Sequence, residues 1–238
     1  MLAAVVSGPK SVASVSGTCL VGYMELVDIF PAFGLRIECG PVTLRAMRES
    51  DAPRVAQLAA DGVHPEGAQP FLTPWNLGKT QPLDSLQFYY RTWAAFTPES
   101  WTLLMAVERD GVMVGAQDMK SEKFAVVRHA ETGSWLGLAH QGRGTGTLMR
   151  QAILTFAFDN LGAVEMRSGA WADNPNSHRV SDKCGYVPNG YLLLDRRGER
   201  VRQDEFVVTP ETFIRPPYEV VVTGAEAFRR AIGLDQTP

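Results

Sequence analysis

The order of apolar and polar residues along the chain predicts short strands that alternate with amphipathic helices. Apolar runs bounded by turn residues predict strands over residues 35–39, 42–47, 101–108, 112–118, 132–138, 164–171, 186–194 and 206–208. Apolar residues at helical spacing predict helices over residues 52–60, 84–96, 147–161, 176–184 and 225–232. This alternation is typical of an α/β or α+β domain in which helices flank a sheet.

Cap residues mark several ends of these predicted helices. Ser50 and Asp51 offer N-cap oxygens to the helix that starts at Ala52. Gly162 and Gly185 directly follow two later helices, where glycine commonly ends a helix. The caps therefore support the helical interpretation of these segments.

Three segments fall outside the regular pattern. Residues 1–34 are expected to form a partly disordered tail, in which Met24 is a candidate start, since a strand-like pattern begins soon after it. Residues 61–82 are rich in glycine, proline and polar residues and predict a long loop, which inside a compact domain is more often functional than idle. We expect one domain over residues 35–215, with residues 216–238 adding a strand and a helix to it.

Composition and charge disfavour several classes of function. The chain has 238 residues, 45% hydrophobic and 21% charged, as in ordinary globular proteins. A net charge of −3 gives no field that gathers nucleic acid. No apolar run reaches the roughly 18–20 residues that span a bilayer. Cys19, Cys39 and Cys184 lack metal-ligand spacing, so we expect reduced thiols in a cytoplasmic protein without a bound metal.

The glycines at 142, 144 and 146 give the most informative signal in the sequence. They follow a predicted strand and open a predicted amphipathic helix. Glycine permits positive φ and the close approach of a ligand. The free N–H groups and the macrodipole at the start of a helix attract an anion. The segment therefore predicts a phosphate-binding loop that needs no lysine.

Two familiar phosphate loops do not fit this segment. The P-loop of nucleotide hydrolases and kinases requires a lysine, and none occurs here. The dinucleotide fingerprint G-x-G-x-x-G fails, because its sixth position counted from Gly142 is Thr147. The pattern Q/R-x-x-G-x-G/A does fit, at Gln141, Gly144 and Gly146.

Segments before and after the loop extend this pattern. They are Val42-Thr43-Leu44-Arg45 followed by Ser50-Asp51, then Gly133-Ser134-Trp135-Leu136-Gly137, and finally Asn174 and Ser177 ahead of Lys183-Cys184-Gly185-Tyr186. Over about residues 35–210 the chain resembles the GNAT superfamily of acyl-CoA N-acyltransferases, closest to the ribosomal-protein N-terminal acetyltransferase (RimJ/RimL-like) branch. The resemblance implies a mixed, mostly antiparallel twisted sheet flanked by helices, with two splayed strands forming an acyl-CoA cleft.

The resemblance also implies which residues bind acetyl-CoA or another acyl-CoA. The pyrophosphate would be held by the loop of Gln141, Gly142, Arg143, Gly144, Thr145, Gly146 and Thr147. The pantetheine arm would lie along the backbone of Trp135, Leu136 and Leu138, with the Leu136 N–H polarising the thioester carbonyl. Asn174 would hydrogen-bond the arm, and its alternative role is a turn or cap residue.

The implied reaction is direct attack of a primary amine on the thioester in a ternary complex. Ser177 is the candidate that protonates the leaving thiolate, or else a hydroxyl that satisfies a helix start. Ser181 stands where many members of the superfamily carry a tyrosine acid. Glu131 is the first candidate for the general base. Other candidates are His140, His178, Asp204 and Glu205.

The sequence leaves the acceptor and the acyl group open. The acceptor is a protein N-terminus or lysine, or a small-molecule amine, facing an apolar wall expected from Phe71, Trp75 and Tyr90. Asp61 and Glu66 are too few to indicate a cationic acceptor. Acetyl is the expected acyl group and succinyl an alternative. A non-catalytic acyl-CoA sensor is the rival function, and exposed sheet edges make a homodimer plausible.

Overall fold

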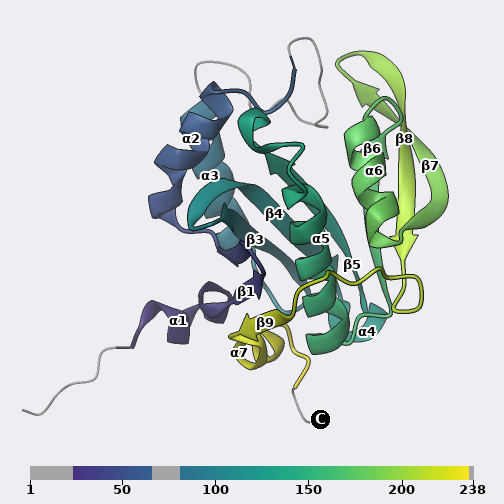
Figure 1. Ribbon diagram of the computed structural model, residues 1–238. Helices are drawn as coiled ribbons and strands as arrows, with labels where there is room; N and C mark the ends of the chain where they lie inside the picture. Colours follow the sequence, from purple (N-terminus) through teal and green to yellow (C-terminus); the bar gives the residue numbers. More distant parts are fainter. Residues whose placement is uncertain (1–23, 66–80, 236–238) are drawn as a thin grey trace, which may run out of the picture.

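A sheet of nine strands organises the computed structural model, which describes residues 24–65 and 81–235 (Figure 1). The strand order is β7-β8-β6-β5-β4-β3-β2-β1-β9, and every neighbouring pair is antiparallel except β5 and β6. The strands are β1 (Arg36–Cys39), β2 (Val42–Ala46), β3 (Ser100–Arg109), β4 (Val112–Glu122), β5 (His129–Leu136), β6 (Glu165–Trp171), β7 (Val187–Arg196), β8 (Glu199–Val208) and β9 (Val220–Thr223). The predicted mixed, mostly antiparallel sheet is confirmed.

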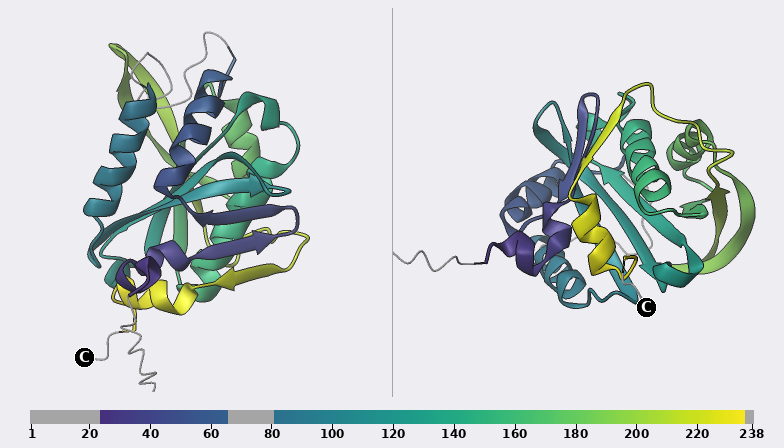
Figure 2. Two further views of the ribbon diagram at one scale, coloured as in Figure 1. Left: turned by 90° about the vertical axis from the view of Figure 1, so that its left-hand side faces the viewer. Right: turned by 90° about the horizontal axis from the view of Figure 1, so that it is seen from below.

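Helices cover both faces of this sheet (Figure 2). The α2 (Ala52–Ala60) and α3 (Gln81–Ala94) helices pack their apolar residues on one face. The α5 (Thr145–Thr155) and α7 (Ala225–Ala231) helices pack into the larger core on the other face, and α6 (Pro175–Cys184) lies against α5. Shorter helical segments are α1 (Leu26–Ile29), α4 (Phe124–Val127), and the 3-10 turns Pro31–Gly34, Glu49–Asp51 and Leu138–His140.

The β5 and β6 strands part soon after they pair. Their parallel register covers only His129–Glu131 against Glu165–Arg167, although β5 continues to Leu136 and β6 to Trp171. Over the remaining residues β5 stays paired with β4, and β6 stays paired with β8. The two strands therefore diverge toward their carboxyl ends, where β5 leads into the glycine loop.

Tertiary packing shifts several predicted boundaries. The predicted strand over 112–118 continues to Glu122, because antiparallel pairing with β3 extends through Ser100. The predicted helix over 147–161 ends in a π-helical turn, Phe156–Asn160. The β8 strand begins at Glu199 instead of residue 206, in a hairpin with β7. Its exposed, charged first half lacks the apolar pattern by which strands are found in a sequence.

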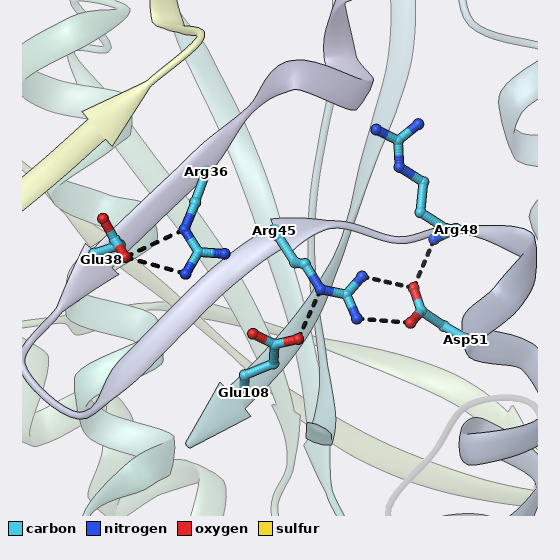
Figure 3. A network of polar contacts seen from close by, with 6 residues as sticks. All are labelled: Arg36, Glu38, Arg45, Arg48, Asp51 and Glu108. Atoms are coloured by element: carbon cyan, nitrogen blue, oxygen red, sulfur yellow. Dashed lines mark hydrogen bonds and ion pairs between the residues drawn. The ribbon is translucent and has the colours of Figure 1, made fainter. Parts of the chain in front are cut away.

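The predicted capping role of Asp51 is wrong. Its carboxylate accepts hydrogen bonds from the Arg48 backbone N–H at 2.7 Å and from both terminal nitrogens of Arg45 at 2.7 and 2.8 Å. Arg45 also donates from Nε to Glu108 at 2.7 Å, so its guanidinium lies between two carboxylates (Figure 3). These bonds raise the pKa of Arg45 and tie β2 to β3 and to the start of α2. A 3-10 turn, rather than a side-chain cap, precedes α2.

The C-terminal segment and the 3-10 turn before β1 pack on the domain, whereas α1 buries no residue. The β9 strand pairs with β1, and α7 places Phe228 against Trp101 and Phe156. The 3-10 turn Pro31–Gly34 contacts α7, while residues 1–23 of the expected tail lie outside the described residues. Within residues 24–65 and 81–235, the helices are all too short or too polar to cross a bilayer.

Candidate active site

The glycine loop presents unsatisfied backbone donors to open space. Gly142 and Gly144 have φ values of 72° and 79°, and a Cβ atom at either one would meet nothing within 4 Å. Gly144 is the N-cap residue of α5 and provides no side-chain cap. The N–H groups of Thr145, Gly146 and Thr147 lie in the first turn, where a helix offers them no partner. Such an uncapped helix start can bind an anion.

Two side chains, those of Gln141 and Arg109, hold this loop in place by hydrogen bonds. Gln141 donates through Nε2 to the carbonyl oxygens of Val63 at 2.9 Å and Leu136 at 3.0 Å. Arg109, at the end of β3, donates to the Arg143 carbonyl at 3.1 Å and to the Thr145 hydroxyl at 2.9 Å. No local pattern points to Arg109, because strand pairing brings it to the loop. The Arg143 side chain itself is exposed.

The backbone N–H groups at the end of β5 and just after it differ in whether the protein itself supplies an acceptor. Gly137 N–H donates to Val114 O on β4 at 2.9 Å. Because amides alternate in direction along an antiparallel strand, the Leu136 N–H points away from β4, toward the side where β6 has diverged. Leu138 N–H instead donates to Gly62 O at 2.9 Å, so it is used within the protein. The Trp135 side chain packs against the core between the sheet and α2 and α3.

Asn174 caps α6, which was one of its two predicted roles. Its Oδ1 accepts from the Ser177 N–H at 3.2 Å, which leaves the two Nδ2 hydrogens for other partners. Ser177 occupies the first turn of α6 and is partly buried. One turn further on, the Ser181 hydroxyl is 1% exposed and has no hydrogen-bond partner among the described residues.

Two carboxylates lie on the face of β4 and β5 that α2 and α3 cover. Glu131 is 45% exposed and pairs with Lys120, with 3.2 Å between Oε2 and Nζ. Asp118, which the sequence reasoning missed, accepts the Gly133 N–H at 3.0 Å, and burial raises its pKa. A Cβ atom at residue 133 would lie 2.7 Å from Asp118 Oδ2, so a larger residue there would displace the Asp118 carboxylate. Only strand pairing reveals that Asp118 lies beside the strand leading to the loop.

The other predicted base candidates have partners or a perturbed pKa. His178 Nε2 lies 3.0 Å from Trp171 O and 3.8 Å from Asp204. Asp204 accepts from Arg202 at 2.6 Å, and Glu205 accepts from Gln203 at 2.9 Å. Burial, together with nearby Arg54 and Arg143, lowers the pKa of His140 beside the loop. No group of three potential metal-ligating side chains occurs in the part of the chain that the structure describes.

The predicted acceptor wall is only partly described. Tyr90 is exposed on α3 and packs edge-on against Trp93, with 5.6 Å between ring centroids. Asp61 accepts from Gln57 at 2.7 Å. Phe71, Trp75 and Glu66 lie outside the described residues.

A buried arginine spans the place where β5 and β6 part. Arg150, on α5, is 3% exposed. Its two terminal nitrogens donate to Ser134 on β5 and to Ser168 on β6, each at 3.0 Å. The Tyr186 ring lies 5.8 Å from its guanidinium carbon. The sequence predicted an amphipathic helix here but no role for this residue.

Comparison with known proteins agrees with this geometry. The sequence model of the acetyltransferase (GNAT) domain matches residues 42–187. Similar folds occur in Mycobacterium smegmatis RimJ in complex with CoA-disulfide (TM-score 0.62, 21% identity, 83% of this chain and 92% of that chain) and in RimL, a ribosomal L7/L12 alpha-N-protein acetyltransferase in complex with coenzyme A (0.59, 16%, 71% and 94%). A spermidine N-acetyltransferase SpeG chimera from Vibrio cholerae and hSSAT is similar as well (0.57, 17%, 71% and 96%). Since the family match covers more than half of its residues, this chain belongs to the GNAT acetyltransferase family.

Proposed function

We propose that this protein transfers an acetyl group from acetyl-CoA to a primary amine by direct attack in a ternary complex. The observation that carries the proposal is the loop of residues 141–147, where two glycines with positive φ face open space at an uncapped helix start. The loop follows β5 directly at the end where β5 and β6 diverge. This arrangement supports a bound pyrophosphate, with the pantetheine arm running between the two strands.

Each step of the reaction has a candidate group in this arrangement. The backbone amides of residues 142–147 bind the pyrophosphate, and the Leu136 N–H polarises the thioester carbonyl. Asn174 donates from Nδ2 to the arm while its oxygen caps α6. Of the two carboxylates on the α2 and α3 face, Asp118 has the raised pKa that suits a general base, whereas Glu131 is paired with Lys120.

The acceptor that we propose is a primary amine of a protein or of a small molecule. Two proteins of similar structure, a ribosomal L7/L12 alpha-N-protein acetyltransferase and a spermidine N-acetyltransferase, have names that denote an amine acceptor. We expect the amine to approach from the face that carries Asp118 and Glu131, and the protein to act in the cytoplasm. Succinyl transfer and acyl-CoA sensing are the alternatives.

Calorimetric titration of Gly144→Val with acetyl-CoA tests the donor site. A valine side chain would fill the open space in front of the loop and strain a positive φ. We expect the affinity for acetyl-CoA to fall at least about 100-fold, or roughly 2.7 kcal/mol. Gly198→Val is the matched control, because Gly198 also has positive φ (86°) and open space but lies in the turn between β7 and β8. Unchanged affinity in Gly144→Val would refute the loop assignment.

Release of free thiol in the presence of amines separates an enzyme from a sensor. We expect acetyl-CoA to release its thiol with at least one member of a panel of N-terminal peptides, lysine peptides and polyamines. Tight binding without thiol release from any of these amines would favour the sensor, and faster release from succinyl-CoA would favour the other acyl group.

A further inference from the structure

We infer that Arg150 stabilises the thiolate of coenzyme A as the leaving group of the transfer reaction. This inference rests on the proposed function, because it concerns the donor of that same reaction. Arg150 contacts both Ser134 and Ser168, which lie on the two strands just beyond their last paired residues, Glu131 and Arg167. An arm that enters at the glycine loop and follows β5 inward brings its sulfur end toward this guanidinium.

The partners of Arg150 leave its charge uncompensated. Both terminal nitrogens bind neutral hydroxyl groups, and Nε, which is buried, has no hydrogen-bond partner among residues 24–65 and 81–235. No ion pair joins Arg150 to a carboxylate within the same residues, although Asp118 on β4 lies within electrostatic range and the neutral Tyr186 hydroxyl also interacts with the guanidinium. A buried charge without a counter-ion is costly, so the site favours an anion that supplies one.

The chemistry of the reaction supplies that anion at this end of the arm. The amine nitrogen bonds to the carbonyl carbon, the C–S bond breaks with its electron pair going to sulfur, and the amine proton passes to the base. The hydroxyl groups that α6 offers are those of Ser177 and Ser181, and a serine hydroxyl is a poor proton donor. A thiolate held beside a guanidinium needs no proton, since a nearby cation lowers the pKa of a thiol.

The affinities of coenzyme A and desulfo-CoA, measured by calorimetry from pH 6.5 to 9.5, test this inference without knowledge of the acceptor. An ordinary thiol has a pKa of about 8.5, and each unit by which binding lowers it favours the thiolate about tenfold. We expect the affinity ratio of coenzyme A to desulfo-CoA to rise at least about tenfold across this range in the wild type. In Arg150→Met the ratio should not change with pH, and Arg150→Lys should restore part of the rise.

The surrounding titratable groups do not imitate this result. They are Asp118 on β4, Cys184 on α6 and Tyr186 after α6; burial raises the pKa of Cys184 to about 11 and raises that of Tyr186. Titration of these groups would change the affinities for coenzyme A and for desulfo-CoA by the same factor. Their effect therefore cancels in the ratio of the two affinities. The wild-type measurement stands even if Arg150→Met fails to fold, and Ser134→Ala offers a milder variant.

The outcomes separate this inference from the proposed function. A wild-type ratio that stays constant while coenzyme A binds would overturn the role of Arg150 and leave the proposed function intact. Absence of any binding of coenzyme A would overturn both. If succinyl-CoA binds at least tenfold more tightly than butyryl-CoA and Arg150→Met removes the difference, the guanidinium binds an acyl carboxylate instead, and the thiolate assignment is wrong.

Discussion

Two arginines, one on strand β2 and one on helix α5, show how differently this protein compensates a positive charge. Arg45, on β2, lies between Asp51 and Glu108 and uses three nitrogens on carboxylate oxygens (Figure 3). Arg150, on α5, is more deeply buried, and its two terminal nitrogens bind the neutral hydroxyl groups of Ser134 and Ser168. The pKa of Arg45 is raised by its partners, whereas Arg150 retains an unpartnered Nε.

The difference separates a region whose charges are compensated within the protein from a region whose donors remain for a ligand. The charges around Arg45 are matched, and they fix β2, β3 and α2 relative to one another. Around α5 the donors remain in excess, namely the first-turn amides and the Nε of Arg150. An anionic ligand such as an acyl-CoA would satisfy both kinds of donor, which is why we propose the donor site around α5.

The largest expected effect distinguishes these two arginines by stability. Arg45→Met leaves Asp51 and Glu108 without their cation, and we expect it to lower the free energy of unfolding by about 3 kcal/mol. Arg150→Met orphans no carboxylate, so we expect a loss of only about 1 kcal/mol or less. Urea denaturation measures both, with Arg36→Met as the control, because Arg36 forms an exposed pair with Glu38. Equal losses in the two variants would remove the basis of the comparison.

A second test concerns Asp118, a partly buried carboxylate that forms no ion pair among the described residues. If Asp118 is the general base, Asp118→Asn should reduce the rate of acetyl transfer about a hundredfold. Glu131→Gln removes a nearby carboxylate that is paired with Lys120 and should have a smaller effect. Steady-state rates with the best amine of the panel measure both. A larger loss in Glu131→Gln would restore the original assignment of the base to Glu131.

The stability of the same Asp118→Asn variant should depend on pH in a defined direction. Burial raises the pKa of Asp118 in the folded protein above its ordinary value. Its favourable contribution is therefore complete below the ordinary pKa and is lost as the pH rises through the raised one. We expect the variant to unfold at a higher urea concentration than the wild type at pH 7, and to show no such advantage at pH 3. A gain at both pH values would show that ionisation is not the cause.

The sequence predicted those parts of the molecule that depend on local pattern. The glycines at 142 and 144 marked the loop because positive φ at a helix start is a local requirement, and the alternating apolar residues marked most strands. Strand pairing, by contrast, decides the placement of Arg109 and Asp118, and the packing of α5 on the sheet decides that of Arg150; no spacing along the chain encodes either. Asp51 misled for another reason, because its carboxylate bonds to the Arg45 side chain and to the Arg48 backbone N–H, which precede it in the chain, instead of capping α2.

The smallest expected effect concerns Asn174. The oxygen of its side-chain amide is bonded within the protein, and its nitrogen is left for a ligand. Its Oδ1 is matched by the Ser177 N–H, whereas its Nδ2 is available to a ligand. Asn174→Ala loses the cap and should cost about 1 kcal/mol in urea denaturation, while Asn174→Ser keeps a cap and should cost much less. If Nδ2 binds the arm, both variants should bind acetyl-CoA about tenfold more weakly, because serine caps the helix but cannot reach as far. Wild-type affinity in Asn174→Ser would mean that Asn174 serves α6 alone, and that the excess of donors ends at the glycine loop and Arg150.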